Sequence, residues 1–126
     1  MKIWKDIRPE FVDQRGEIFK ILDDGKTHIK SVLLITCKPG AIRANHYHKK
    51  DSHYVYMLSG SMDYIEQDID GKNKETAVVK KGDLIFTPSM RPHVMKFLED
   101  SAFLTLATEF RNQDAYENDI VKVKLI

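Results

Sequence analysis

Four of the chain's five histidines fall within two short segments of the sequence. His46 and His48 are separated by one residue, and in an extended strand such residues point to the same side of the sheet. His53 follows in the same segment, and His93 lies in the second one. Imidazole nitrogen is a good ligand for transition metals. The spacing therefore predicts that His46, His48, His53 and His93 bind one divalent metal ion, whose identity among Zn, Fe, Ni, Mn and Cu stays open.

The composition is that of one globular domain covering residues 1–126. The chain is 42% hydrophobic and 31% charged, which is ordinary for such a domain. A net charge of +1 is too small to attract nucleic acid electrostatically. The apolar runs, such as residues 32–35, are far shorter than the roughly 20 residues that cross a membrane, and no signal segment opens the chain. The single Cys37 fits a reducing compartment, so we expect a cytoplasmic protein without nucleic-acid or membrane partners.

Short strand-like segments separated by turn residues recur along the chain. The expected strands are residues 17–22, 29–36, 42–48, 53–58, 61–69, 75–79, 84–87, 94–98, 102–110 and 120–125. Residues 70–73 and 81–83 carry turn signals. Residues 113–118 can form a short helix capped by Asn112, with a polar loop as the alternative. Many short strands in one domain predict an all-β barrel or sandwich.

The two histidine segments resemble the two sequence motifs of the cupin superfamily. The matching positions are Gly40, His46, His48, Gly60, Gly82, Pro88 and His93. His53 stands where the first motif has glutamate, while Met90 and Phe97 replace a glycine and an asparagine of the second motif. The resemblance implies the cupin fold, a double-stranded β-helix of the jelly-roll type, with its barrel core at about residues 29–110.

Within the superfamily, the chain resembles the RmlC-like cupins, which act on nucleotide-linked keto sugars. The stretches that carry this resemblance are Asp13-Gln14-Arg15-Gly16, the segment Arg43-Ala-Asn-His46-Tyr-His48-Lys-Lys50, and Leu106-Ala107-Thr108 with the acidic, aromatic segment through Tyr116. They imply a 3,4-ketoisomerase or, more distantly, a 3,5-epimerase of deoxysugars in polysaccharide biosynthesis. The chain departs from the ketoisomerases at Leu33 and Leu34, where they have a tyrosine, and at His53.

The implied reaction removes a proton next to a carbonyl, so it needs a group that stabilises the enolate oxygen and one that carries the proton. A histidine-bound metal ion can polarise the carbonyl. The proton carrier is then His53 if it is off the metal, a tyrosine such as Tyr47 or Tyr54, or water. If no metal binds, the resemblance to the ketoisomerases makes His48 the base and His46 its partner.

Three arginines are candidates for binding the substrate, which is expected to be a small molecule such as a nucleotide sugar. Arg43 precedes His46 by three residues, and its fork of donors can hold a pyrophosphate. Arg15 and Arg91 invite similar roles. The alternative for Arg43 is a solvated surface arginine, and the alternative for Arg15 is a residue that anchors the first strand.

Two other classes of function fit the histidine spacing. One is an iron- or copper-dependent dioxygenase-type cupin, and the other is a non-catalytic cupin that binds a metal ion or a sugar. Residues 120–125 alternate apolar residues with lysines, as an edge strand does, so we expect a homodimer.

Overall fold

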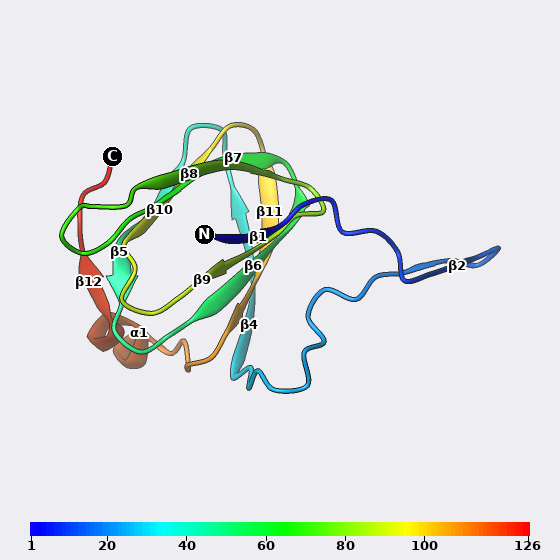
Figure 1. Ribbon diagram of the computed structural model, residues 1–126, viewed down its shortest axis with the longest axis horizontal. Coiled ribbons are helices and arrows are strands. Elements are labelled where there is room, and N and C mark those ends of the chain that lie inside the picture. The colour runs from blue at the N-terminus through cyan, green and yellow to red at the C-terminus, as the bar shows by residue number, and fades with distance from the viewer.

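The computed structural model covers residues 1–126 and consists mainly of antiparallel β-strands (Figure 1). Two separate five-stranded sheets form the body, with strand orders β1-β9-β6-β11-β4 and β12-β5-β10-β7-β8. The strands are β1 (Lys2–Trp4), β2 (Phe11–Asp13), β3 (Gly16–Ile18), β4 (Ser31–Cys37), β5 (Ile42–His48), β6 (His53–Ser59), β7 (Ser61–Glu66), β8 (Glu75–Lys80), β9 (Leu84–Thr87), β10 (His93–Phe97), β11 (Ser101–Ala107) and β12 (Ile120–Lys122). This arrangement confirms the predicted all-β jelly roll.

The apolar core lies between the two sheets. Side chains alternate along β6 and β11, so that every second residue is buried. Met57, Phe97 and Phe103 are fully enclosed, and the rings of Phe97 and Phe103 stack with their centroids 5.5 Å apart. In β6 the buried set begins with His53 and continues with Val55 and Met57. The histidine therefore shares the inner face of the sheet with the core residues.

The observed elements follow the predicted ones closely in the body of the molecule. Strands β5 and β9 have the predicted bounds, and the helix α1 (Gln113–Asp119) forms where a helix or a loop was expected. Asn112 caps this helix, since its side chain accepts a hydrogen bond from the Ala115 N–H. Strands β1 and β2 were missed, and the strand predicted at residues 17–22 ends at Ile18.

Strands β2 and β3 form a hairpin that projects from the body (Figure 1). Its apolar side chains Phe11, Val12 and Ile18 are exposed to solvent in the single chain. The hairpin is too short to bury a core of its own. Its apolar surface is therefore left uncovered by the chain itself.

One turn and one irregular stretch of β5 at the histidine end of the molecule use backbone conformations that favour glycine. Met90, which replaces the glycine of the second cupin motif, has φ = 62°, and its N–H donates to the His48 carbonyl. Ala44 and Asn45, just before His46, also have positive φ. At Gly60 only glycine fits, because a Cβ atom would lie 2.0 Å from Ser101 Oγ and 2.5 Å from the Asp100 carbonyl oxygen.

Candidate metal and substrate site

Four imidazole rings meet between the sheets, as the sequence predicted. The ring centroids of His46 and His48 are 4.8 Å apart, and those of His46 and His93 are 5.0 Å apart. The ring of His53 lies 5.2 Å from that of His48 and 5.5 Å from that of His93. All four residues are buried.

Three strands bring these rings together. His46 and His48 occupy alternate positions of β5, which places both on the inner face of its sheet. His93 begins β10, which pairs with β5 so that His93 lies opposite His46. His53 begins β6 in the facing sheet. The two sheets therefore contribute to one site, although the histidines span nearly fifty positions of the chain.

Each of three rings uses its Nδ1 atom in a hydrogen bond that fixes its orientation. His48 Nδ1 lies 3.0 Å from Asp119 Oδ2, and His53 Nδ1 lies 3.1 Å from Asp51 Oδ2. His93 Nδ1 lies 3.0 Å from the Arg91 carbonyl oxygen. These acceptors require a proton on Nδ1, which leaves the lone pair on Nε2. This is the arrangement that orients histidine ligands in metal sites.

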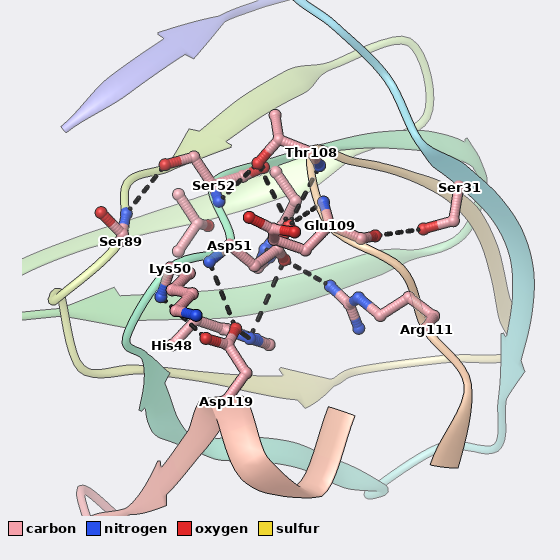
Figure 2. A network of polar contacts seen from close by, with 12 residues as sticks. Ser31, His48, Lys50, Asp51, Ser52, Ser89, Thr108, Glu109, Arg111 and Asp119 are labelled. Atoms are coloured by element: carbon pink, nitrogen blue, oxygen red, sulfur yellow. Dashed lines mark hydrogen bonds and ion pairs between the residues drawn. The ribbon is translucent and has the colours of Figure 1, made fainter. Parts of the chain in front are cut away.

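Asp51 is a buried carboxylate that holds the loop before β6 in place (Figure 2). Its Oδ1 accepts from the N–H groups of Thr108 and Glu109, and its Oδ2 accepts from Arg111 and His53. Burial raises the pKa of Asp51, but hydrogen bonding to His53 and the charge of Arg111 outweigh it and hold the pKa at about 2. Since its oxygens already have these partners, we assign Asp51 to orienting His53 rather than to binding a metal.

The histidine rings are uncharged at neutral pH. Burial lowers the pKa of His46 to about 3 and that of His48 to about 4, and the neighbouring rings and the Arg111 guanidinium act in the same direction. Burial also lowers the pKa of His53 and of His93. Neutral imidazole is the form that binds metal ions.

The donor set fits a divalent transition ion. One nitrogen from each of His46, His48 and His93 lies within 4.8 Å of the other two, and all three rings are buried and neutral. Nitrogen ligands of this kind suit Zn, Fe, Cu and Ni. His53 belongs to a second group of possible ligands, with His48 and Asp51.

A cavity of about 200 Å³ adjoins the rings. Besides the four histidines, its polar wall includes Arg43, Thr105, Arg111 and Tyr116. The Tyr116 ring lies 6.2 Å from that of His46 and 6.0 Å from that of His48, and the Arg111 guanidinium lies 5.3 Å from the centre of the Tyr116 ring. Tyr116 is therefore the tyrosine placed for contact with a ligand in this cavity.

The tyrosines named from the sequence lie elsewhere. Tyr54 points to the outer face of β6 and packs against Trp4 and Phe86, with ring centroids 6.1 and 4.8 Å away. Tyr47 alternates with His46 and His48 and so lies on the other side of β5. The geometry therefore separates Tyr54, the catalytic candidate, from the histidine cavity.

Of the three predicted substrate-binding arginines, one lines the histidine cavity and two are paired elsewhere. Arg43 lines the cavity, and its guanidinium donates to Cys37 Sγ and the Thr36 carbonyl oxygen. Arg15 lies on the projecting hairpin and pairs with Asp13. Arg91 is held by several acceptors, namely Glu66, Asp68, Glu75 and the Asn73 carbonyl. Only Arg43 of these three is available to a ligand near the histidines.

Sequence reasoning missed four residues of the site, which are Asp51, Arg111, Tyr116 and Asp119. The last three lie in or beside α1, more than fifteen positions after the last histidine. Their spacing carries no strand alternation and no metal motif. The acidic and aromatic character of the segment through Tyr116 was the only signal, and it does not show which side chains turn inward.

Comparison with known proteins agrees with the fold and the site. The cupin domain family matches residues 33–108, which is more than half of the chain. The protein therefore belongs to the cupin family. No curated protein matches the chain.

Several solved structures have a similar fold. The TDP-quinovose 3,4-ketoisomerase of Campylobacter jejuni is 30% identical, with a TM-score of 0.74, and the match covers 93% of this chain and 94% of that one. A 3,4-ketoisomerase of Helicobacter canadensis is 24% identical, with a TM-score of 0.77 and coverage of 96% and 89%. The RmlC epimerase of Mycobacterium tuberculosis is 22% identical, with a TM-score of 0.71 and coverage of 86% and 64%. The neighbours thus include nucleotide-sugar isomerases and epimerases, the class that the sequence motifs resemble.

Proposed function

We propose that the protein is a metal-binding cupin that isomerises or epimerises a nucleotide-linked keto-deoxysugar in polysaccharide biosynthesis. The observation that supports the metal site is that one nitrogen from each of His46, His48 and His93 lies within 4.8 Å of the other two, while the Nδ1 hydrogen bonds of His48 and His93 leave Nε2 of these rings free for a ligand. The similarity to the 3,4-ketoisomerase of Campylobacter jejuni over nearly the whole chain supports the reaction class.

The reaction begins with removal of a proton from the carbon next to the sugar carbonyl. A bound divalent ion would supply Lewis-acid polarisation of that carbonyl. His46, His48 and His93 would hold the ion and, being neutral, would leave it with its full charge. The Tyr116 hydroxyl is the group we assign to proton transfer, because Tyr116 shares the cavity with these rings.

The same geometry supports an acid–base reaction without metal. His48 is then the base and Asp119 orients it, since the carboxylate accepts from Nδ1 and stabilises the imidazolium that forms. A histidine that binds metal cannot also remove the proton. Metal content therefore decides between the two forms of the proposal.

The first experiment is elemental analysis of the purified protein and of His46→Ala, His93→Ala and the exposed His28→Ala. We expect about one transition ion per chain in the wild type and in His28→Ala, and loss of the ion in the other two variants. A wild-type protein without bound ion, and without affinity for added Zn²⁺, Fe²⁺, Mn²⁺ or Ni²⁺, would contradict the metal site and leave the acid–base form.

The second experiment measures exchange of solvent deuterium into a thymidine diphosphate-linked 4-keto-6-deoxy sugar by NMR. Incorporation at the carbon next to the carbonyl is the expected result. Oxygen uptake dependent on ferrous iron, without exchange, would assign the dioxygenase class instead. Tight sugar or metal binding with neither reaction would assign a non-catalytic cupin.

The proposal includes a homodimer in a cytoplasmic setting. Residues 120–125, the edge named from the sequence, are mostly half-buried against β5. Exposed apolar side chains instead gather on the edge strand β4, at Val32 and Leu34, and on the hairpin of β2 and β3. No helix has the length and apolar character needed to cross a membrane.

A further inference from the structure

Arg111 lies in the loop between β11 and α1 and forms part of the wall of the histidine cavity. Only 13% of its side chain is exposed. It lines the same cavity as all four histidines, and its guanidinium lies 5.3 Å from the centre of the Tyr116 ring. The resemblance to other cupins did not point to this residue.

The guanidinium of Arg111 is held by a hydrogen bond to Asp51, but most of its N–H donors have no acceptor in the protein. Its Nη2 donates to Asp51 Oδ2 over 2.8 Å, and its plane lies over the Tyr116 ring (Figure 2 shows the Asp51 contact). Nε is buried without a partner, and Nη1 makes no hydrogen bond with the protein. An arginine has five N–H donors, so most of the donor capacity of Arg111 remains unused.

Of the other candidate arginines, Arg91 and Arg15 are paired away from the cavity, and Arg43 uses more of its donors on the protein than Arg111 does. Arg91 is held by three carboxylates and a carbonyl. Arg43 uses Nε and Nη2 on Cys37 and Thr36, and Arg15 is paired with Asp13 outside the cavity. A fixed positive charge with free donors beside the neutral histidines is therefore found at Arg111.

We infer that Arg111 donates hydrogen bonds to the sugar oxygen that becomes negatively charged during the reaction. This inference rests on the proposed function. When the proton leaves the carbon next to the carbonyl, the electron pair of the C–H bond forms the C=C bond and the carbonyl oxygen becomes an enolate. The proton passes to the base and later returns to carbon. A pre-positioned cationic donor stabilises this charge more than it stabilises the neutral ketone.

The size of the cavity favours this assignment over a role in binding the diphosphate. Its volume of about 200 Å³ lies below the range that holds drug-sized ligands, so we assign Arg111 to the sugar ring rather than to the nucleoside diphosphate. Loss of Arg111 should therefore lower kcat while the KM of the nucleotide sugar changes little.

The test uses oxalate, a planar dianion that resembles an enediolate, and measures its binding by calorimetry at matched metal content. The variants are Arg111→Gln, Arg111→Lys and, as a control, Arg8→Gln, whose side chain is exposed and pairs with Asp6. We expect Arg111→Gln to weaken oxalate binding about 10- to 100-fold, Arg111→Lys to restore part of the affinity, and Arg8→Gln to match the wild type. Thermal unfolding of each variant verifies that the fold is retained.

The outcomes separate this inference from the proposed function. Unchanged oxalate affinity in folded Arg111→Gln would overturn the role of Arg111. If the wild type fails to exchange deuterium while Arg111→Gln still weakens oxalate binding, the proposed reaction is refuted and Arg111 stands as an anion-binding residue. If Arg111→Gln does not fold, Arg111→Lys is the deciding variant. Oxalate affinity equal to that of the wild type would then show that the guanidinium fork of Arg111 does not hydrogen-bond the anion.

Discussion

Three of the four histidines of this site are oriented by hydrogen bonds from their Nδ1 atoms. Three of their Nδ1–H groups donate to the buried carboxylate of Asp51, the half-buried carboxylate of Asp119 and one backbone carbonyl, and none of these acceptors could be identified from the HxH spacing. The convergence of His46 and His48 was predictable because β-strand alternation fixes the side to which both residues point. Their orienting partners come from loops and a helix, where sequence spacing does not determine direction.

Replacing Asp119 by asparagine should weaken metal binding by about 10- to 100-fold, because the ring of His48 loses its charged acceptor. The measurement is competition with a chelating dye for Zn²⁺. Asp114→Asn, in the first turn of the same helix, serves as the control and should bind the ion as the wild type does. Equal affinities for the two variants would show that Asp119 does not orient a ligand.

The metal-free protein should lose stability as the pH falls below about 6.5. Unfolded histidines protonate with an ordinary pKa of 6.5, whereas His46 and His48 stay neutral in the folded state down to about pH 3 and 4. Protons therefore favour the unfolded chain, and at pH 5 each ring costs about 2 kcal/mol of unfolding free energy.

Urea unfolding at pH 7.5 and pH 5 measures this loss. His46→Gln should reduce the difference between the two pH values, and the exposed His28→Gln should leave it unchanged. A difference of the same size in His46→Gln would assign the acid sensitivity to other groups.

Among the secondary-structure elements, the short helix α1 contributes two side chains to the site. It carries Tyr116 in the cavity wall and Asp119 beside His48, and none of its residues is buried. A short helix with no buried side chain depends on its caps and on the contacts at its end. The geometry of the site is thus coupled to the stability of α1.

Asn112→Ala should therefore impair the site without changing any residue that touches the ligand. The helix loses the hydrogen bond from Ala115 N–H, which costs about 1 kcal/mol, and the affinity for metal should fall with it. Asn112→Ser, which retains a capping oxygen, should restore both properties. Chelator competition and urea unfolding are the two measurements, and wild-type values for Asn112→Ala in both would contradict the coupling.

Alternation and turn residues made the central strands predictable, and β5 and β9 have their predicted bounds. The three-residue strands β1 and β2 escaped prediction because so short a segment shows no period. Whether residues 113–118 form a helix also could not be settled from the sequence. The capping hydrogen bond of Asn112 and the contact of Asp119 with the loop at Lys50 fix it only in the folded chain.

At the scale of the whole molecule, exposed apolar side chains gather on β4 and on the hairpin of β2 and β3. Val32 and Leu34 on β4 are more than half exposed, and the hairpin adds Phe11, Val12 and Ile18. Exposed patches of this kind commonly mark protein interfaces. The homodimer was predicted from residues 120–125, and the exposed side chains favour β4 and the hairpin as its interface instead.

Light scattering at micromolar concentration should therefore give twice the mass of the chain. Leu34→Asp should shift the protein to monomer, because a charge would be buried in the interface. Lys124→Asp introduces the same charge at the far edge and should remain dimeric. A monomeric wild type would refute the dimer, and a monomeric Lys124→Asp would move the interface to the C-terminal edge.

Trp4, the single tryptophan, sits on the outer side of the molecule beside Tyr54, away from the imidazoles. Because β1 and β4 are opposite edges of one sheet, Trp4 lies away from the interface proposed at β4. Its emission maximum should therefore stay constant on dilution and shift only when the chain unfolds.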